Sequence, residues 1–115
     1  REVNFALEAA KTLEAEGIDV EVLDLRSLVP LDWDAIVKSV SKTHNVIIVS
    51  EEVKRGSYAG ELSAQIAEEL FDELDAPVER VCGLNICSPF SPTLEDENFP
   101  HPETIVKAVK RVLNK

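Results

Sequence analysis

Two adjacent carboxylates, Glu51 and Glu52, are the pair whose type and spacing could do acid–base chemistry in this sequence. They follow the apolar run from Asn45 to Ser50, which predicts a fully buried parallel strand. Ligands gather at the carboxyl ends of strands in open α/β sheets, and paired carboxylates can act as acid and base when their pKa values are pushed apart. The sequence shows no further partner for the pair, so solvated residues at a strand end are the simpler interpretation.

The other reactive side chains lack the neighbours that their chemistry needs. Asp24 stands at the end of a predicted strand, as in a response-regulator receiver, but the acidic pair and the lysine that hold Mg²⁺ and phosphate there are missing. His44 and His101 have no Ser, Cys or acidic neighbour at triad spacing. Cys82 and Cys87 cannot complete a four-ligand zinc site, and we interpret them as ordinary thiols, with a disulfide or a metal as the alternative. We therefore predict no catalytic, cofactor-binding or metal-binding residue.

Length and charge restrict the class of protein and its partners. The 115 residues suffice for one domain, and the net charge is −10, with 22 acidic against 12 basic residues. This balance disfavours nucleic acid and would suit a basic partner. No run approaches the ~20 apolar residues of a membrane span, so no membrane partner is expected. The four glycines form no phosphate-binding loop.

Helical and strand patterns alternate along the chain. Helices are predicted over 3–13, before Gly17, over 32–43, with Asp32 as N-cap, from 58 to about Leu74, and from Pro102 to the C-terminal end. Strands are predicted over 18–25, 45–50 and 78–82. The order α-β-α-β-α-β-loop-α indicates a parallel sheet with helices on both faces. Such a unit should open with a strand, so we expect a first strand to be missing from this chain.

Residues 83–100, with the sequence GLNICSPFSPTLEDENFP, are a long segment without helical or strand periodicity. Segments of this length are uncommon in compact domains and tend to be functional or disordered. Five large apolar residues argue against disorder. They are Leu84, Ile86, Phe90, Leu94 and Phe99. We expect this loop to pack against a partner surface.

Four stretches, in order, carry a family resemblance: ALEAAKTLEAEGIDVEVLDLRSLVPLD, NVIIVSEE, AGELSAQIAEELFDELDAPVERVCG and SPFSPTLEDENFP. Together they resemble the C-terminal domain of the transketolase family. They look most like the β subunit of the E1 component of 2-oxoacid dehydrogenase complexes, of pyruvate, branched-chain or acetoin type. The alternatives are the corresponding domain of a transketolase or deoxyxylulose-phosphate synthase, and a free-standing α/β signalling or adaptor module.

The resemblance implies a three-layer, mostly parallel α/β domain over residues 1–115, as a fragment of a longer E1 β subunit. Family members use thiamine diphosphate and Mg²⁺, held between other domains, so none is expected to bind here. The assembled enzyme decarboxylates a 2-oxo acid and passes the acyl group to lipoyl-E2. The expected partners are E1 α, a second E1 β and the peripheral-subunit-binding domain of E2. The bacterial cytoplasm is the expected location, with mitochondrion or plastid as alternatives.

The resemblance also assigns two surfaces. The loop residues that match the family's subunit interface are Pro89, Phe90, Leu94, Glu95 and Pro100. The acidic end of the third helix is the expected docking surface for the basic E2 domain, through Glu68, Glu69, Asp72 and Glu73. A solvated helix face is the alternative for these four residues. The turn Arg55-Gly56-Ser57-Tyr58 departs from the family's RTGG turn, and Asn85 and Cys87 replace the Asp and Pro of many relatives.

Overall fold

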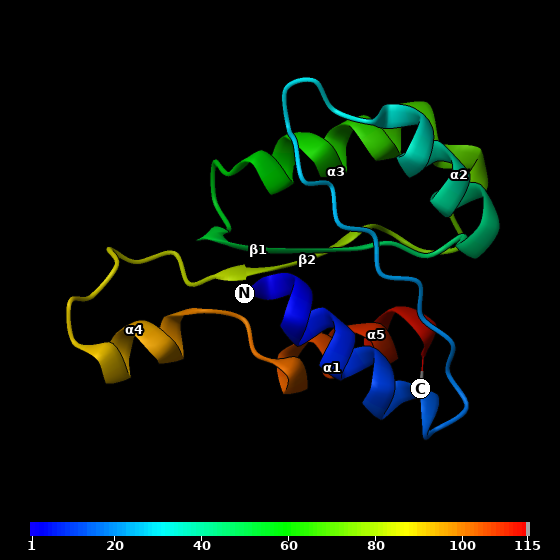
Figure 1. Ribbon diagram of the computed structural model, residues 1–115. Helices are drawn as coiled ribbons and strands as arrows, with labels where there is room; N and C mark the ends of the chain where they lie inside the picture. The colour runs from blue at the N-terminus through cyan, green and yellow to red at the C-terminus, as the bar shows by residue number, and fades with distance from the viewer. Residues whose placement is uncertain (115) are drawn as a thin grey trace.

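Two parallel strands lie between two layers of helices in the computed structural model, which describes residues 1–114 (Figure 1). Strand β1 (Ile47–Val53) pairs with β2 (Glu79–Gly83), and Ile47 lies opposite Glu79. Helices α2 (Trp33–Thr43) and α3 (Tyr58–Glu69) cover one face, and α1 (Glu2–Glu14) and α5 (Pro102–Leu113) cover the other. The predicted α/β class with a parallel sheet and helices on both faces is confirmed.

Each helix layer has its own apolar core against the strands. The layer of α2 and α3 buries five aliphatic residues: Ile36, Val40, Leu62, Ile66 and Leu70. The layer of α1 and α5 buries a second group: Ala9, Leu13, Ile18, Val81, Ile105, Ala108 and Val109. Most of these positions belong to the helical stripes in the sequence. Apolar residues at helical spacing therefore indicated the inward face of α2, α3 and α5. In α1 the same spacing was misleading, because Val3 and Leu7 are exposed whereas Ala9 is buried.

The predicted helix boundaries rest on local chemistry that the structure confirms. Asp32 caps α2, where its Oδ1 accepts a hydrogen bond from Ala35 N at 3.1 Å. Gly17 has a φ of +82°, as the turn after α1 requires. Pro102 begins α5, where its missing N–H leaves no donor unsatisfied. No helix in residues 1–114 is long and apolar enough to cross a membrane.

The strand prediction for residues 18–25 is wrong. The segment forms no ladder with another segment, and within residues 1–114 no backbone N–H from 19 to 25 donates a hydrogen bond. Its alternating side chains suit a strand, but a strand exists only where a neighbour pairs with its backbone. The prediction that the central strand is fully buried is also wrong, because Ile47, Ile48 and Val49 remain half-buried.

Further boundaries differ from the prediction. Strand β1 begins at Ile47 and ends at Val53, so Glu51 and Glu52 lie within it and not after it. Helix α3 ends at Glu69, not near Leu74, and the 3₁₀ turn η1 (Phe71–Glu73) follows it. This turn lets Glu73 O reach His44 Nδ1 at 2.7 Å, so a tertiary contact replaces the last helical turn. The segment predicted as irregular contains a short helix, α4 (Pro92–Asn98), which begins with a proline at its first position.

Gly83 lies where the backbone of β1 and the backbone at Asn98 approach closely. A Cβ added there would lie 2.9 Å from Glu51 O, 3.2 Å from Glu52 O and 3.4 Å from Asn98 O. We expect Gly83→Ala to lower the free energy of unfolding by about 1–3 kcal/mol, because backbone atoms cannot move aside as a side chain can. Urea unfolding monitored by circular dichroism measures the change.

The matched control is Gly60→Ala in α3. Its Cβ would meet only Arg80 Nη1, at 3.3 Å, the flexible end of a side chain. Because alanine favours a helix by about 0.5–1 kcal/mol over glycine, Gly60→Ala should be neutral or stabilising. Equal losses in the two variants would contradict the assignment.

Candidate functional site

Glu51 and Glu52, the pair of carboxylates considered in the sequence analysis, contact other residues of the fold. Neither shares a cleft with a nucleophile or a cation. Glu52 Oε2 accepts a hydrogen bond from Tyr58 N at 3.1 Å and so caps the start of α3. Glu51 lies near Glu2. Burial of the Glu2 carboxyl raises its pKa, and the charge of Glu51 raises that pKa further. Neither carboxylate oxygen of Glu2 has a hydrogen-bond partner among residues 1–114.

The remaining candidates are kept apart by the fold. Asp24 Oδ1 accepts from Arg26 N at 3.1 Å, as a loop residue does. His44 ends α2 and His101 precedes α5, where its Nε2 lies 2.7 Å from Asp96 O. Cys82 is half-buried, which raises the pKa of its thiol, and both thiols are free. Over the described 114 residues, no three His, Cys, Asp or Glu side chains form a metal-binding group.

The segment from Leu84 to Leu94 exposes several large apolar side chains. Leu84, Ile86 and Leu94 are each more than half exposed, and Phe90 is fully exposed. At Phe90 the segment therefore has almost no contact with the rest of this chain. Clustered exposed apolar side chains of this kind mark interaction sites.

The proposed interface residues divide into exposed and inward-facing ones. Phe90, Leu94 and Glu95 are exposed, whereas Pro89 is half-buried. Pro100 is fully buried, so its side chain supports the loop from inside the domain. The fold thus exposes Phe90 and Leu94 to solvent and buries Pro100.

Both roots of this loop are fixed by hydrogen bonds. Asn98 is buried, and its Oδ1 accepts from Leu84 N at 3.2 Å. Asn85 Oδ1 accepts from Arg55 N at 2.8 Å, which joins the loop to the segment after β1. No pattern in the sequence marks Asn98, because a buried asparagine looks like any loop asparagine until its partner is known.

Arg1 holds α4 from the other side. Its guanidinium lies 4.9 Å from the Phe99 ring centroid and 5.4 Å from that of Phe5. It also forms an ion pair with Asp96, with Nη2 2.9 Å from Oδ1. Cation–π contacts and the ion pair together connect the start of α1 to α4. These contacts of Arg1 therefore hold in place the segment that follows the exposed apolar loop.

The acidic residues predicted for docking form a second surface. Glu68 and Glu69 are exposed at the end of α3, and Asp72 is exposed in η1. Glu73 is half-buried, with Oε2 3.9 Å from His44 Nδ1. Phe71, at the centre of this group, is 72% exposed, which the helical pattern did not predict. This acidic surface and α4 lie at opposite ends of the molecule (Figure 1).

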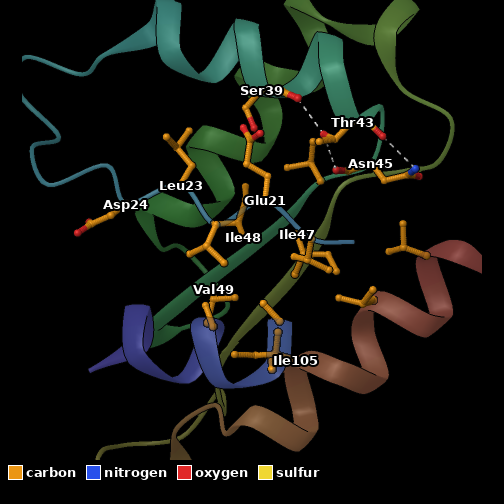
Figure 2. A pocket seen from close by; sticks show the side chains of 18 of the residues that line it. Glu21, Leu23, Asp24, Ser39, Thr43, Asn45, Ile47, Ile48, Val49 and Ile105 are labelled. Carbon is orange, nitrogen blue, oxygen red and sulfur yellow. Dashed lines mark hydrogen bonds between the residues drawn. The ribbon is translucent and has the colours of Figure 1, made fainter. Parts of the chain in front are cut away.

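A slot of about 450 Å³ lies between β1 and residues 18–26 (Figure 2). Helices α1 and α5 line it from one side, and α2 and α3 from the other. Its walls are mainly aliphatic, and Ser39, Thr43, Glu21 and Asp24 add polar groups. Three carboxylates line the slot, those of Glu2, Glu21 and Asp24, and they would repel a diphosphate. Among the described lining residues only Arg26 offers a positive charge to set against them. We therefore derive no cofactor chemistry from the slot.

The comparisons with known proteins identify the class of protein that this fold and these surfaces define. Residues 1–105 match the family described as "Transketolase, C-terminal domain", and the chain belongs to that family. A solved structure described as "Split gene transketolase, inactive beta4 tetramer" superposes with a TM-score of 0.75 and 34% identity. The match covers 97% of this chain and 35% of that one.

Among curated proteins, the chain is similar to β subunits of E1 enzymes. It is 46% identical to "Pyruvate dehydrogenase E1 component subunit beta, mitochondrial" of Caenorhabditis elegans, over 99% of this chain and 33% of that protein. It is 47% identical to "Acetoin:2,6-dichlorophenolindophenol oxidoreductase subunit beta" of Bacillus subtilis, over 98% and 33%. It is 40% identical to "2-oxoisovalerate dehydrogenase subunit beta" of the same bacterium, over 96% and 34%. The chain thus spans about a third of the length of these relatives.

Asn98→Ala tests whether the buried amide fixes the loop. The change leaves Leu84 N with only the backbone acceptor Asn98 O, at 3.3 Å, and an unfilled space behind the loop. We expect a loss of about 1–3 kcal/mol in stability and faster hydrogen exchange at Leu84. Asn85→Ala, which removes the hydrogen bond at the other root, should cost less, because Asn85 is exposed and water can replace that bond. If both variants behave alike, Asn98 is not the anchor.

Proposed function

We infer that this chain is the C-terminal domain of a longer E1 β subunit in a thiamine-diphosphate-dependent 2-oxoacid dehydrogenase. In the complete enzyme, a 2-oxo acid is oxidatively decarboxylated and its acyl group passes to lipoyl-E2. This domain contributes contacts between subunits and not catalytic groups. The observation that carries the proposal is the supported loop with Phe90 fully exposed, in a chain 40–47% identical to E1 β-type subunits.

The loop supports a role in assembly because its apolar residues are costly to leave in water. Burying a Phe or Leu side chain contributes about 1.5–3 kcal/mol, so covering Phe90 and Leu94 would favour association. The anchored roots of the loop reduce the entropy lost when a partner binds. The partners that fit the proposal are E1 α and a second E1 β.

The acidic surface supports a second role, in docking E2. None of the ion pairs formed by residues 1–114 includes Glu68 or Asp72, so their charges remain free for a basic partner. Phe71 offers an aromatic contact between them, a common anchor at interfaces. The basic peripheral-subunit-binding domain of E2 is the partner that this charge and this aromatic residue suit.

Phe90→Ser in the longer E1 β subunit tests the assembly role. We expect the variant subunit to fold but to associate at least about tenfold more weakly with E1 α and E1 β, as measured by light scattering over a concentration series. Phe71→Ser is the matched control, because it removes an exposed aromatic at the other end of the domain. Unchanged assembly with Phe90→Ser would remove the loop from the interface.

The double change Glu68→Lys with Asp72→Lys tests the docking role. We expect weaker binding of the E2 peripheral-subunit-binding domain, by about tenfold or more at low salt, and a smaller dependence on salt. Titration calorimetry at two salt concentrations measures both. Glu8→Lys with Glu14→Lys on α1 makes the same change in net charge elsewhere on the surface. If this control weakens binding equally, only net charge matters and the proposed surface is wrong.

A further inference from the structure

His44 holds the turn η1 and the residues after it at two neighbouring points. Its ring Nδ1 lies 2.7 Å from Glu73 O, and since a carbonyl oxygen can only accept a hydrogen bond, Nδ1 is the donor. The backbone O of His44 accepts from Asp75 N at 2.8 Å. One residue at the end of α2 therefore fixes the backbone on both sides of Leu74.

The backbone of His44 is itself held by α2. Its N donates to Val40 O at 2.8 Å, and its φ of +62° places it in the left-handed region that ends the helix. Asn, Asp and His are the side-chain-bearing residues most enriched in this region, and Gly enters it without steric cost. The ring of His44 thus extends from a fixed position toward η1.

The turn η1 has few hydrogen bonds of its own. Glu73 N donates to Leu70 O at 2.9 Å, and Leu74 N donates to Phe71 O at 3.2 Å. Short 3₁₀ turns have poorer hydrogen-bond geometry than an α-helix. The apolar spacing that runs through α3 to Leu74 would suit a continued α-helix equally well. The two hydrogen bonds from His44 therefore favour the observed turn over a competing conformation.

The conformation of η1 determines which side chains of the acidic surface lie together. Leu70 is buried and Leu74 packs against the same core, whereas Phe71 is 72% exposed and Asp72 is exposed. Successive side chains rotate by about 120° in a 3₁₀ turn and by about 100° in an α-helix. A continued helix would therefore point Phe71 and Asp72 in other directions relative to the acidic residues of α3.

We propose that His44 is a positioning residue of the acidic surface, whose ring donor holds η1 in the conformation that exposes Phe71 and Asp72 together to a basic partner. This inference rests on the docking role proposed above. His44 acts through Glu73 and Asp75 and has no need to contact the partner itself. A neutral imidazole with its hydrogen on Nδ1 already supplies the donor.

His44→Asn and His44→Asp are a matched pair of tests, because both new residues tolerate the left-handed backbone and have nearly the same size. The amide of Asn places a donor near the position of Nδ1, whereas an ionised Asp can only accept. In the longer E1 β subunit, we expect His44→Asn to bind the peripheral-subunit-binding domain of E2 as the unchanged subunit does. His44→Asp should bind it about fivefold more weakly, because η1 is competent for a smaller fraction of the time. Titration calorimetry measures both.

Charge alone predicts the opposite order. His44→Asp adds a carboxylate beside the acidic surface, which would favour a basic partner. Equal or tighter binding by His44→Asp would therefore overturn the proposal, and so would equal losses in the two variants. His44→Gly keeps the left-handed backbone without a side-chain donor and serves if His44→Asp does not fold. It should also weaken binding, and full binding by this variant would overturn the proposal.

Hydrogen exchange separates a failure of this inference from a failure of the docking role. We expect exchange at Leu74 and Asp75 to be about tenfold faster in His44→Asp and His44→Gly, but not in His44→Asn. Exchange at Leu70, whose N donates to Ile66 O at 2.8 Å, should not change. If the unchanged subunit does not bind the E2 domain, the docking role is wrong, and exchange still decides whether His44 holds the turn. Unchanged exchange at Leu74 and Asp75 would overturn the positioning role even where docking is found.

Discussion

The structure depends on one parallel ladder, between β1 and β2, because each helix layer packs against these two strands. The backbone bonds of the ladder fix Val49 opposite Val81. Side chains of the two strands then enter the opposite helix layers, Ile48 on one side and Ile47, Val49 and Val81 on the other. Since two strands are a narrow base for helices on both faces, part of the apolar surface of those helices stays uncovered. The slot lies where the two strands leave this apolar surface uncovered.

Near the carboxyl ends of β1 and β2, the fold concentrates close contacts. Gly83, at the end of β2, approaches the carbonyls of β1, and the chain then continues into the loop that carries Phe90. Arg80 Nη1 donates to Lys54 O at 2.7 Å and secures the segment after β1. The exposed loop therefore begins from one of the most tightly packed parts of the domain. Binding loops are commonly positioned by a rigid scaffold, and this loop has one.

The sequence predicted those features that depend on residues close along the chain. The cap at Asp32, the turn at Gly17 and the start at Pro102 are local signals, and all three are confirmed. The apolar residues Leu62, Ile66 and Leu70, at helical spacing, indicated the buried face of α3. The end of this helix depends on a contact between His44 and Glu73, two residues far apart in sequence. The short helix α4 was missed because its polar residues leave no apolar period over seven positions.

Residues 18–25 show why the remainder could not be predicted. Alternation reports which side chains suit a pleated surface, but pairing is a property of two segments. The candidate surfaces divide in the same way. Phe90 and Leu94 were found from their unusual apolar character, whereas Asn98 and the exposure of Phe71 depend on tertiary neighbours. The acidic residues were predicted on the end of one helix, but Asp72 and Glu73 lie in the turn after α3, and Glu73 contacts His44 within the domain.

Exposure of Phe90 has a consequence for how the stability of this domain is defined. A partner that binds only the folded form stabilises it by mass action, in proportion to the logarithm of the free partner concentration. If the loop is covered by another subunit, the domain has no single free energy of unfolding independent of its partner's abundance. An excess of unpartnered chains would then display Phe90 to chaperones and proteases, and the balance of subunit synthesis would set how long each chain survives.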